Sequence, residues 1–328
     1  MKSPFFTRLF ETLRIAAPAL LALIVLNIGL AHQNIWPTLW IRTTPEISLE
    51  LVVFVTGIAL AAAFGLNFGK RAQWALSALL LLLVFARYVD VTAPALFGRR
   101  VDLYWDTQHI PAITAMVIES WSPMAIAALV LATLGVFAAL IFIIRTCLAA
   151  IHGAVALPAY RRIVILAGTL LLGVYAVGMN SDARDWERRF AIPITPVYFE
   201  QARDISARLA GITAVAQTPA PPLRPYAELG GRDVYVVFLE SYGRIALNDD
   251  AYAHETRATL TELEAGLGAH GWHTRSGFLT APTFGGASWL SHSSLMAGHA
   301  VHSHDLYQSF LHSQDETITD RVRKAGYR

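Results

Sequence analysis

Five long apolar segments fill the first 179 residues and constrain the fold more than any other feature of this chain. Each segment is close to or above the ~18 residues at which an apolar stretch indicates a helix that crosses a membrane. The predicted spans are Ile15–Ala31, Leu51–Phe68, Trp74–Phe97, Met124–Ile144 and Ile163–Met179. The sequence therefore predicts a five-helix transmembrane domain over residues 1–179.

The composition agrees with an integral membrane protein. Of the 328 residues, 55% are hydrophobic and only 15% are charged, whereas a soluble domain has about 25% charged residues. Cys147 is the only cysteine, which excludes a disulfide scaffold. A formal net charge of +2 is too small to indicate a nucleic-acid binder. We therefore expect the membrane as a partner and no nucleic acid.

Basic residues between the spans predict the orientation. With a cytoplasmic N-terminus, eight Lys and Arg residues lie inside and three lie outside, in agreement with the positive-inside rule. The inside residues are Lys2, Arg8, Arg14, Lys70, Arg71, Arg145, Arg161 and Arg162, and the outside residues are Arg42, Arg99 and Arg100. Everything after Met179 is then extracytoplasmic. A cleaved signal peptide in place of the first span is an alternative that leaves this orientation unchanged.

Two ionisable residues, Arg87 and Asp90, interrupt the third span. Their i,i+3 spacing allows them to pair on one helix face near the outer end of the span, and a functional role is the alternative. The loop that follows, Arg99–Pro111, mixes Tyr104 and Trp105 with charged residues, which is typical of a segment at headgroup depth. A role in binding a lipid substrate is the alternative for this loop.

The chain changes character after the last span. Residues 180–230 are predicted to form an extracytoplasmic linker, with an amphipathic stretch near Tyr198–Leu209 and prolines at positions 219, 221, 222 and 225 that suit a semi-rigid spacer. From residue 231 the pattern becomes α/β. Asp233–Leu239 is a continuous β-branched and aromatic run, typical of a strand buried on both faces of a mainly parallel sheet. The other predicted elements are a strand at Gly277–Thr280 and helices at Glu255–His270, from near Ser288, and at Asp315–Ala325.

Two side chains in residues 231–328 indicate chemistry. Glu240 follows the predicted strand, where a carboxylate is poorly solvated unless a metal or another cation balances it. Capping or salt-bridging of a loop is the alternative for this residue. Ser288 follows two glycines and begins an apolar helix, so its hydroxyl is either a helix N-cap or a nucleophile activated by the helix dipole and a metal. The glycines allow a phosphate or sulfate group to approach the backbone closely.

The motifs VVFLESYG and FGGASWLSHSSLMAG together resemble the sulfatase-like branch of the alkaline phosphatase superfamily. The chain is most similar to the membrane-bound lipoteichoic acid synthases and phosphoethanolamine transferases, which carry five spans before an extracytoplasmic catalytic domain. The resemblance implies a bacterial plasma (inner) membrane protein with an α/β sulfatase-like domain in residues 231–328. It also implies that Glu240 is a metal ligand and that Ser288 is both the catalytic nucleophile and a metal ligand.

The chain departs from the sulfatases in ways that favour phosphoryl transfer. Leu290 and His292 stand where the Cys/Ser-x-Pro-x-Arg pattern has Pro and Arg, and the paired aspartates are missing at Glu240-Ser241. By resemblance, the metal is Mn²⁺, Zn²⁺ or Mg²⁺. Ser288 then takes a phosphoglycerol or phosphoethanolamine headgroup from a phospholipid donor and passes it to an envelope glycan acceptor through a covalent phospho-enzyme. With water as the acceptor, the alternative is a sulfuric-ester or phosphodiester hydrolase.

Further candidate residues surround Ser288. His292 lies at i+4 on the same helix face, and together with Ser291 and Gly286 it is a candidate for contacting the substrate or supporting the nucleophile. The downstream spacing H-x-x-H-x-H at residues 299–304 suggests zinc ligands, with solvent-facing loop histidines as the alternative.

The pattern of the C-terminal part stops where a further strand is expected. We therefore interpret residues 231–328 as the N-terminal part of a catalytic domain that is incomplete at the C-terminus. The family's Asp-His pair and its other histidine ligands would lie beyond Arg328. A non-catalytic, truncated membrane protein that serves a partner is accordingly a third functional hypothesis.

Overall fold

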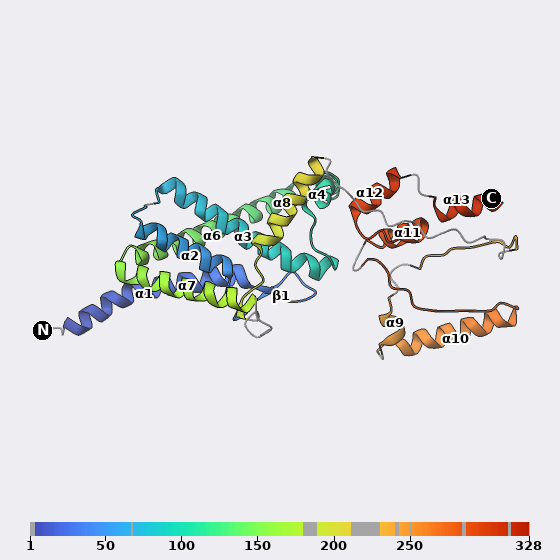
Figure 1. Cartoon of the computed structure of the whole chain (residues 1–328), viewed down its shortest axis with the longest axis horizontal. Coiled ribbons are helices and arrows are strands. Elements are labelled where there is room, and N and C mark those ends of the chain that lie inside the picture. The colour runs from blue at the N-terminus through green and yellow to red at the C-terminus, as the bar shows by residue number, and fades with distance from the viewer. Residues whose placement is uncertain are drawn as a thin grey trace. The chain divides into compact units, whose positions relative to one another are not determined.

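A computed structural model shows the arrangement of the chain (Figure 1). It describes residues 4–66, 68–179, 189–210, 230–239, 243–249, 251–283, 287–313 and 316–327, with side chains from Arg14 onward. The chain divides into two compact units, Met1–Ile212 and Thr213–Arg328. The amphipathic stretch near Tyr198–Leu209 thus falls in the first unit together with the membrane helices.

The first unit is a helical bundle. Its long helices are α1 (Pro4–Ala31), α2 (Leu49–Ala63), α3 (Lys70–Phe97), α6 (Pro123–Val155) and α7 (Pro158–Met179), and its shorter elements are β1 (Gln33–Asn34), β2 (Ile41–Arg42), α4 (Leu103–Asp106), η1 (Thr107–His109), α5 (Ile110–Ser120) and α8 (Thr195–Leu209). Helix α1 packs mainly on α6, and α2 packs mainly on α7. Leu26, Leu80, Leu148 and Val155 lie in the buried core.

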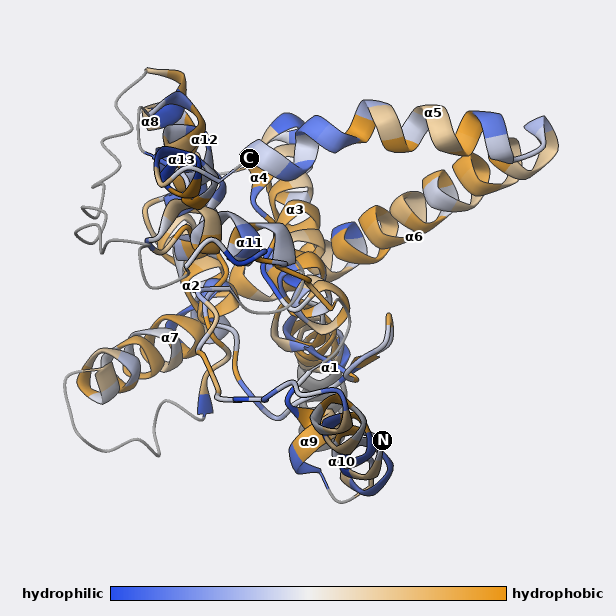
Figure 2. Cartoon of the chain, turned by 90° about the vertical axis from the view of Figure 1, so that its right-hand side faces the viewer, coloured by the Kyte–Doolittle hydropathy of each residue, from blue (hydrophilic) through white to orange (hydrophobic). Residues whose placement is uncertain are grey.

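Four of the predicted spans are confirmed as helices long and apolar enough to cross a membrane. They are Arg14–Ala31 within α1, together with α3, α6 and α7, and hydrophobic residues predominate along α6 and α7 in Figure 2. Helix α2 is shorter, with 15 residues, or about 22 Å against a hydrocarbon core of about 30 Å. It ends at Ala63, before the predicted limit at Phe68, because Phe64 caps it and Gly65 turns the backbone with φ 76°. The count of five spans is therefore not confirmed.

One end of this bundle carries residues 32–48, 98–109 and 189–210, and we call it the hairpin end. Ile47 and Phe190 form a parallel bridge. Helix α8 is held there by Gln201, whose amide accepts from the Leu103 N–H at 2.9 Å and donates to the Val101 carbonyl at 3.0 Å. The segment after α7 thus returns to the bundle as a docked helix.

Two charged side chains of the bundle hold this returning segment. The Glu50 carboxylate accepts from the backbone N–H groups of Ile194 at 2.5 Å and Thr195 at 3.2 Å, at the positive end of α8. Arg87 is 2% exposed. It donates to the carbonyls of His32 at 3.0 Å and Ile192 at 3.1 Å.

The predicted pairing of Arg87 with Asp90 is not formed. Asp90 instead forms an ion pair with Arg100 at 3.4 Å. The reason is tertiary: the returning segment brings a backbone carbonyl to Arg87, and the turn after α3 brings a second guanidinium to Asp90.

All regular elements in the described part of the second unit are helices. It contains α9 (Ile245–Asn248), α10 (Ala253–Ala269), α11 (Ser288–Ala297), α12 (His304–His312) and α13 (Ile318–Lys324). Helix α10 contacts α9, and α11 contacts both α12 and α13. The helices predicted over Glu255–His270, from near Ser288 and over Asp315–Ala325 correspond to α10, α11 and α13.

The two predicted strands of this unit do not form in the described residues. Asp233–Leu239 and Gly277–Thr280 have no regular structure, and the sheet found among the described residues is the β1–β2 pair of the first unit. A parallel strand exists only where neighbours pair its backbone and cover its faces. Here Tyr235 is 83% exposed and Val236, on the opposite face of an extended run, is 56% exposed, so neither face of the apolar run is fully covered. The described residues therefore give no support to an α/β architecture.

Candidate functional site at the start of helix α11

Helix α11 begins at Ser288, the predicted nucleophile. The residue before it, Ala287, has φ 51° and ψ 34°. This left-handed conformation costs a residue with a β-carbon about 1–2 kcal/mol, and such strain is concentrated at functional sites. The chain thus enters the helix through a strained turn directly before the candidate nucleophile.

The Ser288 hydroxyl does not cap the helix. Ala287 occupies the N-cap position without a side-chain hydrogen bond, and Ser288 is the first helical residue. Its side chain is exposed, and none of the described residues forms a hydrogen bond with it. The N-cap interpretation is therefore wrong for this structure, and the hydroxyl is accessible to a ligand at the positive end of the helix dipole.

Ser291 contacts a residue that precedes the loop before the helix. Its hydroxyl and that of Thr283 are 2.5 Å apart, which ties residues on both sides of the Phe284–Gly286 segment to each other. Gly286 itself lies outside the described residues. Ser291 therefore supports the approach to Ser288 in this structure, while its predicted contact with substrate stays a prediction.

His292 brings the predicted metal-binding segment to α11. Its ring lies against that of Phe238, with centroids 4.0 Å apart and planes inclined by 31°. Phe238 belongs to the apolar run that ends before Glu240, so the two motifs of the sequence meet through an aromatic contact. Glu240 lies outside the described residues, and its role as a metal ligand stays a prediction.

A small hydrophobic cluster holds α11 in place. Leu290, Ala297 and Val301 are buried in it, and Leu306, Tyr307 and Phe310 of α12 pack against them. The Ser294 hydroxyl accepts from the Val301 N–H at 2.8 Å and so closes the turn after the helix. These contacts bury one side of α11 while Ser288 remains exposed.

The downstream histidines have aromatic neighbours. The ring of His304 lies 5.1 Å from that of Trp289, and the ring of His299 lies 6.0 Å from that of Phe310. Within the described residues there is no group of three or more His, Cys, Asp or Glu side chains that could hold a metal. A serine oxygen and a carboxylate suit a hard or borderline cation, but the described residues supply too few of these ligands to complete such a site.

Sequence reasoning missed three contributors to this site: Ala287, Thr283 and Phe238. An alanine gives no local signal for left-handed backbone, because the sequence offered Gly285 and Gly286 as the flexible positions. Thr283 and Phe238 act through contacts across 8 and 54 residues, which local patterns do not reveal.

Comparison with known proteins found no match among family models, curated proteins or solved structures.

Proposed function

We propose that the chain is a membrane-anchored, metal-dependent transferase. In this proposal it moves a phosphoglycerol or phosphoethanolamine headgroup from a phospholipid to an envelope glycan. The observation that supports it most is the Ser288 hydroxyl, which is exposed at the N-terminus of α11 after a strained residue. The resemblance of the two motifs to the sulfatase-like superfamily, including its α/β domain, is part of the same proposal.

The proposed reaction has two displacements at phosphorus. The Ser288 oxygen forms a bond to the phosphorus of the headgroup phosphodiester, and the bond from phosphorus to the diacylglycerol oxygen breaks. Diacylglycerol leaves with the proton that the serine has lost. An acceptor hydroxyl then attacks the same phosphorus, and Ser288 regains a proton as it is released.

The side chains around Ser288 have supporting roles in this proposal. His292 lies one helical turn further along and contacts Phe238, and in the proposal it orients the nucleophile or the phosphate. A divalent cation bound by Glu240 and the Ser288 oxygen would stabilise the developing negative charge. The helix dipole adds to that stabilisation at the first turn of α11.

The membrane location follows from the same proposal. A lipid donor stays in the bilayer, so an enzyme that uses it must act at the membrane surface. The long apolar helices supply that attachment. We propose a bacterial plasma membrane, a cytoplasmic N-terminus and an extracytoplasmic second unit, with α2 crossing the membrane despite its short length.

Headgroup transfer tests the proposal directly. The full chain is reconstituted with Mn²⁺ in vesicles that contain phosphatidylglycerol and phosphatidylethanolamine with labelled headgroups, and a glycan acceptor is added. We expect diacylglycerol release, a labelled protein intermediate and label on the glycan. Ser288→Ala abolishes all three signals. Ser293→Ala is the matched control, because the Ser293 hydroxyl only donates to the Trp289 carbonyl within the helix.

The outcomes separate the three functional hypotheses. Label released as a free phosphorylated headgroup means that water is the acceptor and that the hydrolase alternative is correct. Transfer that persists in Ser288→Ala refutes the nucleophile assignment. A complete lack of diacylglycerol release from both lipids with Mn²⁺, Zn²⁺ and Mg²⁺ contradicts the enzyme proposal and favours a non-catalytic role.

A further inference from the structure

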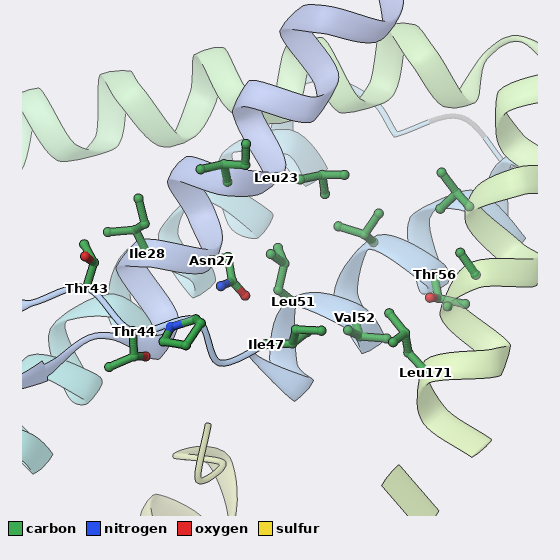
Figure 3. Close-up of a pocket in the computed structure, with 16 residues that line it drawn as sticks. Leu23, Asn27, Ile28, Thr43, Thr44, Ile47, Leu51, Val52, Thr56 and Leu171 are labelled. Carbon is green, nitrogen blue, oxygen red and sulfur yellow. The ribbon is translucent and has the colours of Figure 1, made fainter. Parts of the chain in front are cut away.

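A cavity of about 550 Å³ lies in the first unit between α1, α2, α7 and the segment Thr43–Ile47. Figure 3 shows its walls: Leu23 of α1, Leu51 and Val52 of α2, and Leu171 of α7 surround the space, with Thr43 and Thr44 at its hairpin end. Its volume lies in the range of ~300–1,000 Å³ that is typical of ligand pockets.

The cavity is built by fixed contacts at both of its ends. At the hairpin end, the Asn27 amide donates to the Glu46 carbonyl at 2.8 Å and accepts from the Ser48 N–H at 2.9 Å. Further along, α2 and α7 touch closely, since a β-carbon on Gly168 would lie 1.9 Å from the Thr56 hydroxyl. The helices are held together at these points, and the side chains between them do not fill the space.

The lining decides what can occupy this space. It is mainly aliphatic, with the polar groups of Asn27, Thr43 and Thr44 at the hairpin end and of Thr56 beside α7, and an apolar cavity of this kind does not retain water. An empty space would deprive the lining of dispersion contacts. Because α1 and α7 are long and apolar enough to lie in a bilayer, the fluid around the partly open cavity is lipid hydrocarbon. An acyl chain enters from that fluid without any cost of desolvating polar groups.

The hairpin end supplies the features that match a lipid headgroup. Trp36 and Trp40, between β1 and β2, are 75% and 74% exposed, as is typical of aromatic residues at headgroup depth. Arg42 directly precedes Thr43, is exposed, and has no ion-pair partner among the described residues. A guanidinium group binds phosphate oxygens through two parallel hydrogen bonds.

We propose that the cavity binds one acyl chain of a membrane phospholipid, with Arg42 binding the phosphate of the same molecule. This site lies wholly in the first unit and does not depend on the proposed function of Ser288. It is a lipid-binding site of the membrane bundle, and its occupant closes the gap between α2, α7 and α1.

Lipid retention tests this proposal. The full chain is reconstituted with dioleoylphosphatidylglycerol, extracted in a mild detergent and measured by native mass spectrometry. We expect about one lipid retained per chain. Val52→Trp fills the cavity and abolishes retention. Val53→Trp is the matched control, because Val53 is the next residue of α2, is 53% exposed and does not line the cavity.

A second pair of variants tests the headgroup contact. Arg42→Gln lowers retention about tenfold, as expected for the loss of a charged hydrogen bond, and Arg42→Lys restores part of it. Arg71→Gln, an exposed arginine at the start of α3, leaves retention unchanged. If Arg42→Gln retains as much lipid as the unmodified chain, the phosphate contact is refuted.

The lipid-binding role of the cavity is refuted if the unmodified chain retains no lipid. It is also refuted if Val52→Trp retains as much lipid as Val53→Trp. If Val52→Trp fails to fold, Ala167→Phe at the exposed rim of the cavity replaces it and is read in the same way. Ser288→Ala retains the lipid if both proposals hold. Failure of headgroup transfer with normal retention therefore refutes only the proposed enzyme function.

Discussion

Single charged side chains on the membrane helices fix the path of the chain at the hairpin end. Arg87 donates to two carbonyls that belong to segments 55 and 105 residues away. Glu50 accepts from the first N–H groups of α8, 144 and 145 residues away. Both groups are partly or fully removed from water, where a hydrogen bond to a charged group contributes about 1.5–3 kcal/mol. Residues of this kind explain why residues 189–210 dock on the bundle.

Replacing Arg87 tests whether its two hydrogen bonds stabilise the bundle. Arg87→Met keeps most of the volume but leaves the carbonyls of His32 and Ile192 without their donor. We expect the bundle to lose about 1–3 kcal/mol of unfolding free energy, measured by thermal unfolding of the full chain in detergent. The matched control is Arg71→Met on the exposed start of the same helix. Equal unfolding temperatures for the two variants would contradict the assigned role.

A second residue-level prediction concerns pH. Burial is the largest single influence and pushes the pKa of the Asp106 carboxyl upward. The hydrogen bonds from Arg99, at 2.7 and 2.9 Å, and from the Asp102 N–H, together with the positive charges of Arg99 and His109, outweigh burial and leave the pKa below its ordinary value. A pKa lowered by folding contributes stability above the ordinary aspartate pKa of about 3.9. That contribution is lost as the pH falls through the lowered value.

Carbon-13 NMR of labelled aspartate side chains measures this shift. We expect Asp106 to titrate below the ordinary aspartate pKa of about 3.9. Arg99→Gln brings the Asp106 titration back toward higher pH, because it removes the hydrogen bonds and the charge of Arg99 while burial continues to raise the pKa. An unchanged titration in Arg99→Gln would show that the ion pair is not the cause.

At the scale of elements, the apolar run Asp233–Leu239 differs most from its prediction: the sequence predicts a buried strand, and the structure shows an irregular, exposed segment. Its composition is typical of a buried strand, yet five of its side chains are more than half exposed: Val234, Tyr235, Val236, Val237 and Leu239. An apolar run with both faces open is a common site of aggregation or of pairing with another strand. Helices α10, α11 and α13, by contrast, agree with the sequence because each is specified by its own consecutive residues.

Cysteine accessibility distinguishes an exposed run from a buried strand. Cys147 is the only native cysteine and is 8% exposed, so it contributes little background. We expect Val237→Cys in the full chain to react with a maleimide as fast as an unfolded chain does. Val301→Cys is the protected control, since Val301 is 0% exposed. Protection of Val237→Cys at native pH would instead support the sheet that the sequence predicts.

At the scale of the whole molecule, the arrangement of the helix ends bears on the number of spans. Asn27 near the end of α1 contacts the start of α2, while the Arg161 guanidinium near the start of α7 donates to the Ala62 carbonyl at the end of α2. Helix α2 therefore runs between the same two ends of the bundle as its longer neighbours. This arrangement favours a crossing by α2, for which the bilayer would have to thin locally.

Labelling from one side of the membrane tests that arrangement. In right-side-out vesicles and a Cys147→Ala background, an impermeant maleimide should label Leu39→Cys and Arg203→Cys without permeabilisation. It should label Gly69→Cys, between α2 and α3, only after permeabilisation. Labelling of Gly69→Cys from outside would mean that α2 does not cross and that the orientation derived from basic residues is wrong.

The sequence by itself determined the long helices and the start of α11, because an apolar run or a helical pattern is a property of consecutive residues. It also singled out Ser288, although not the left-handed alanine before it. Only the tertiary structure decided how Arg87 and Asp90 are paired, where α8 docks and that a cavity separates α1, α2 and α7. Those features arise between residues up to 145 positions apart, and their energies depend on distances that no local pattern encodes.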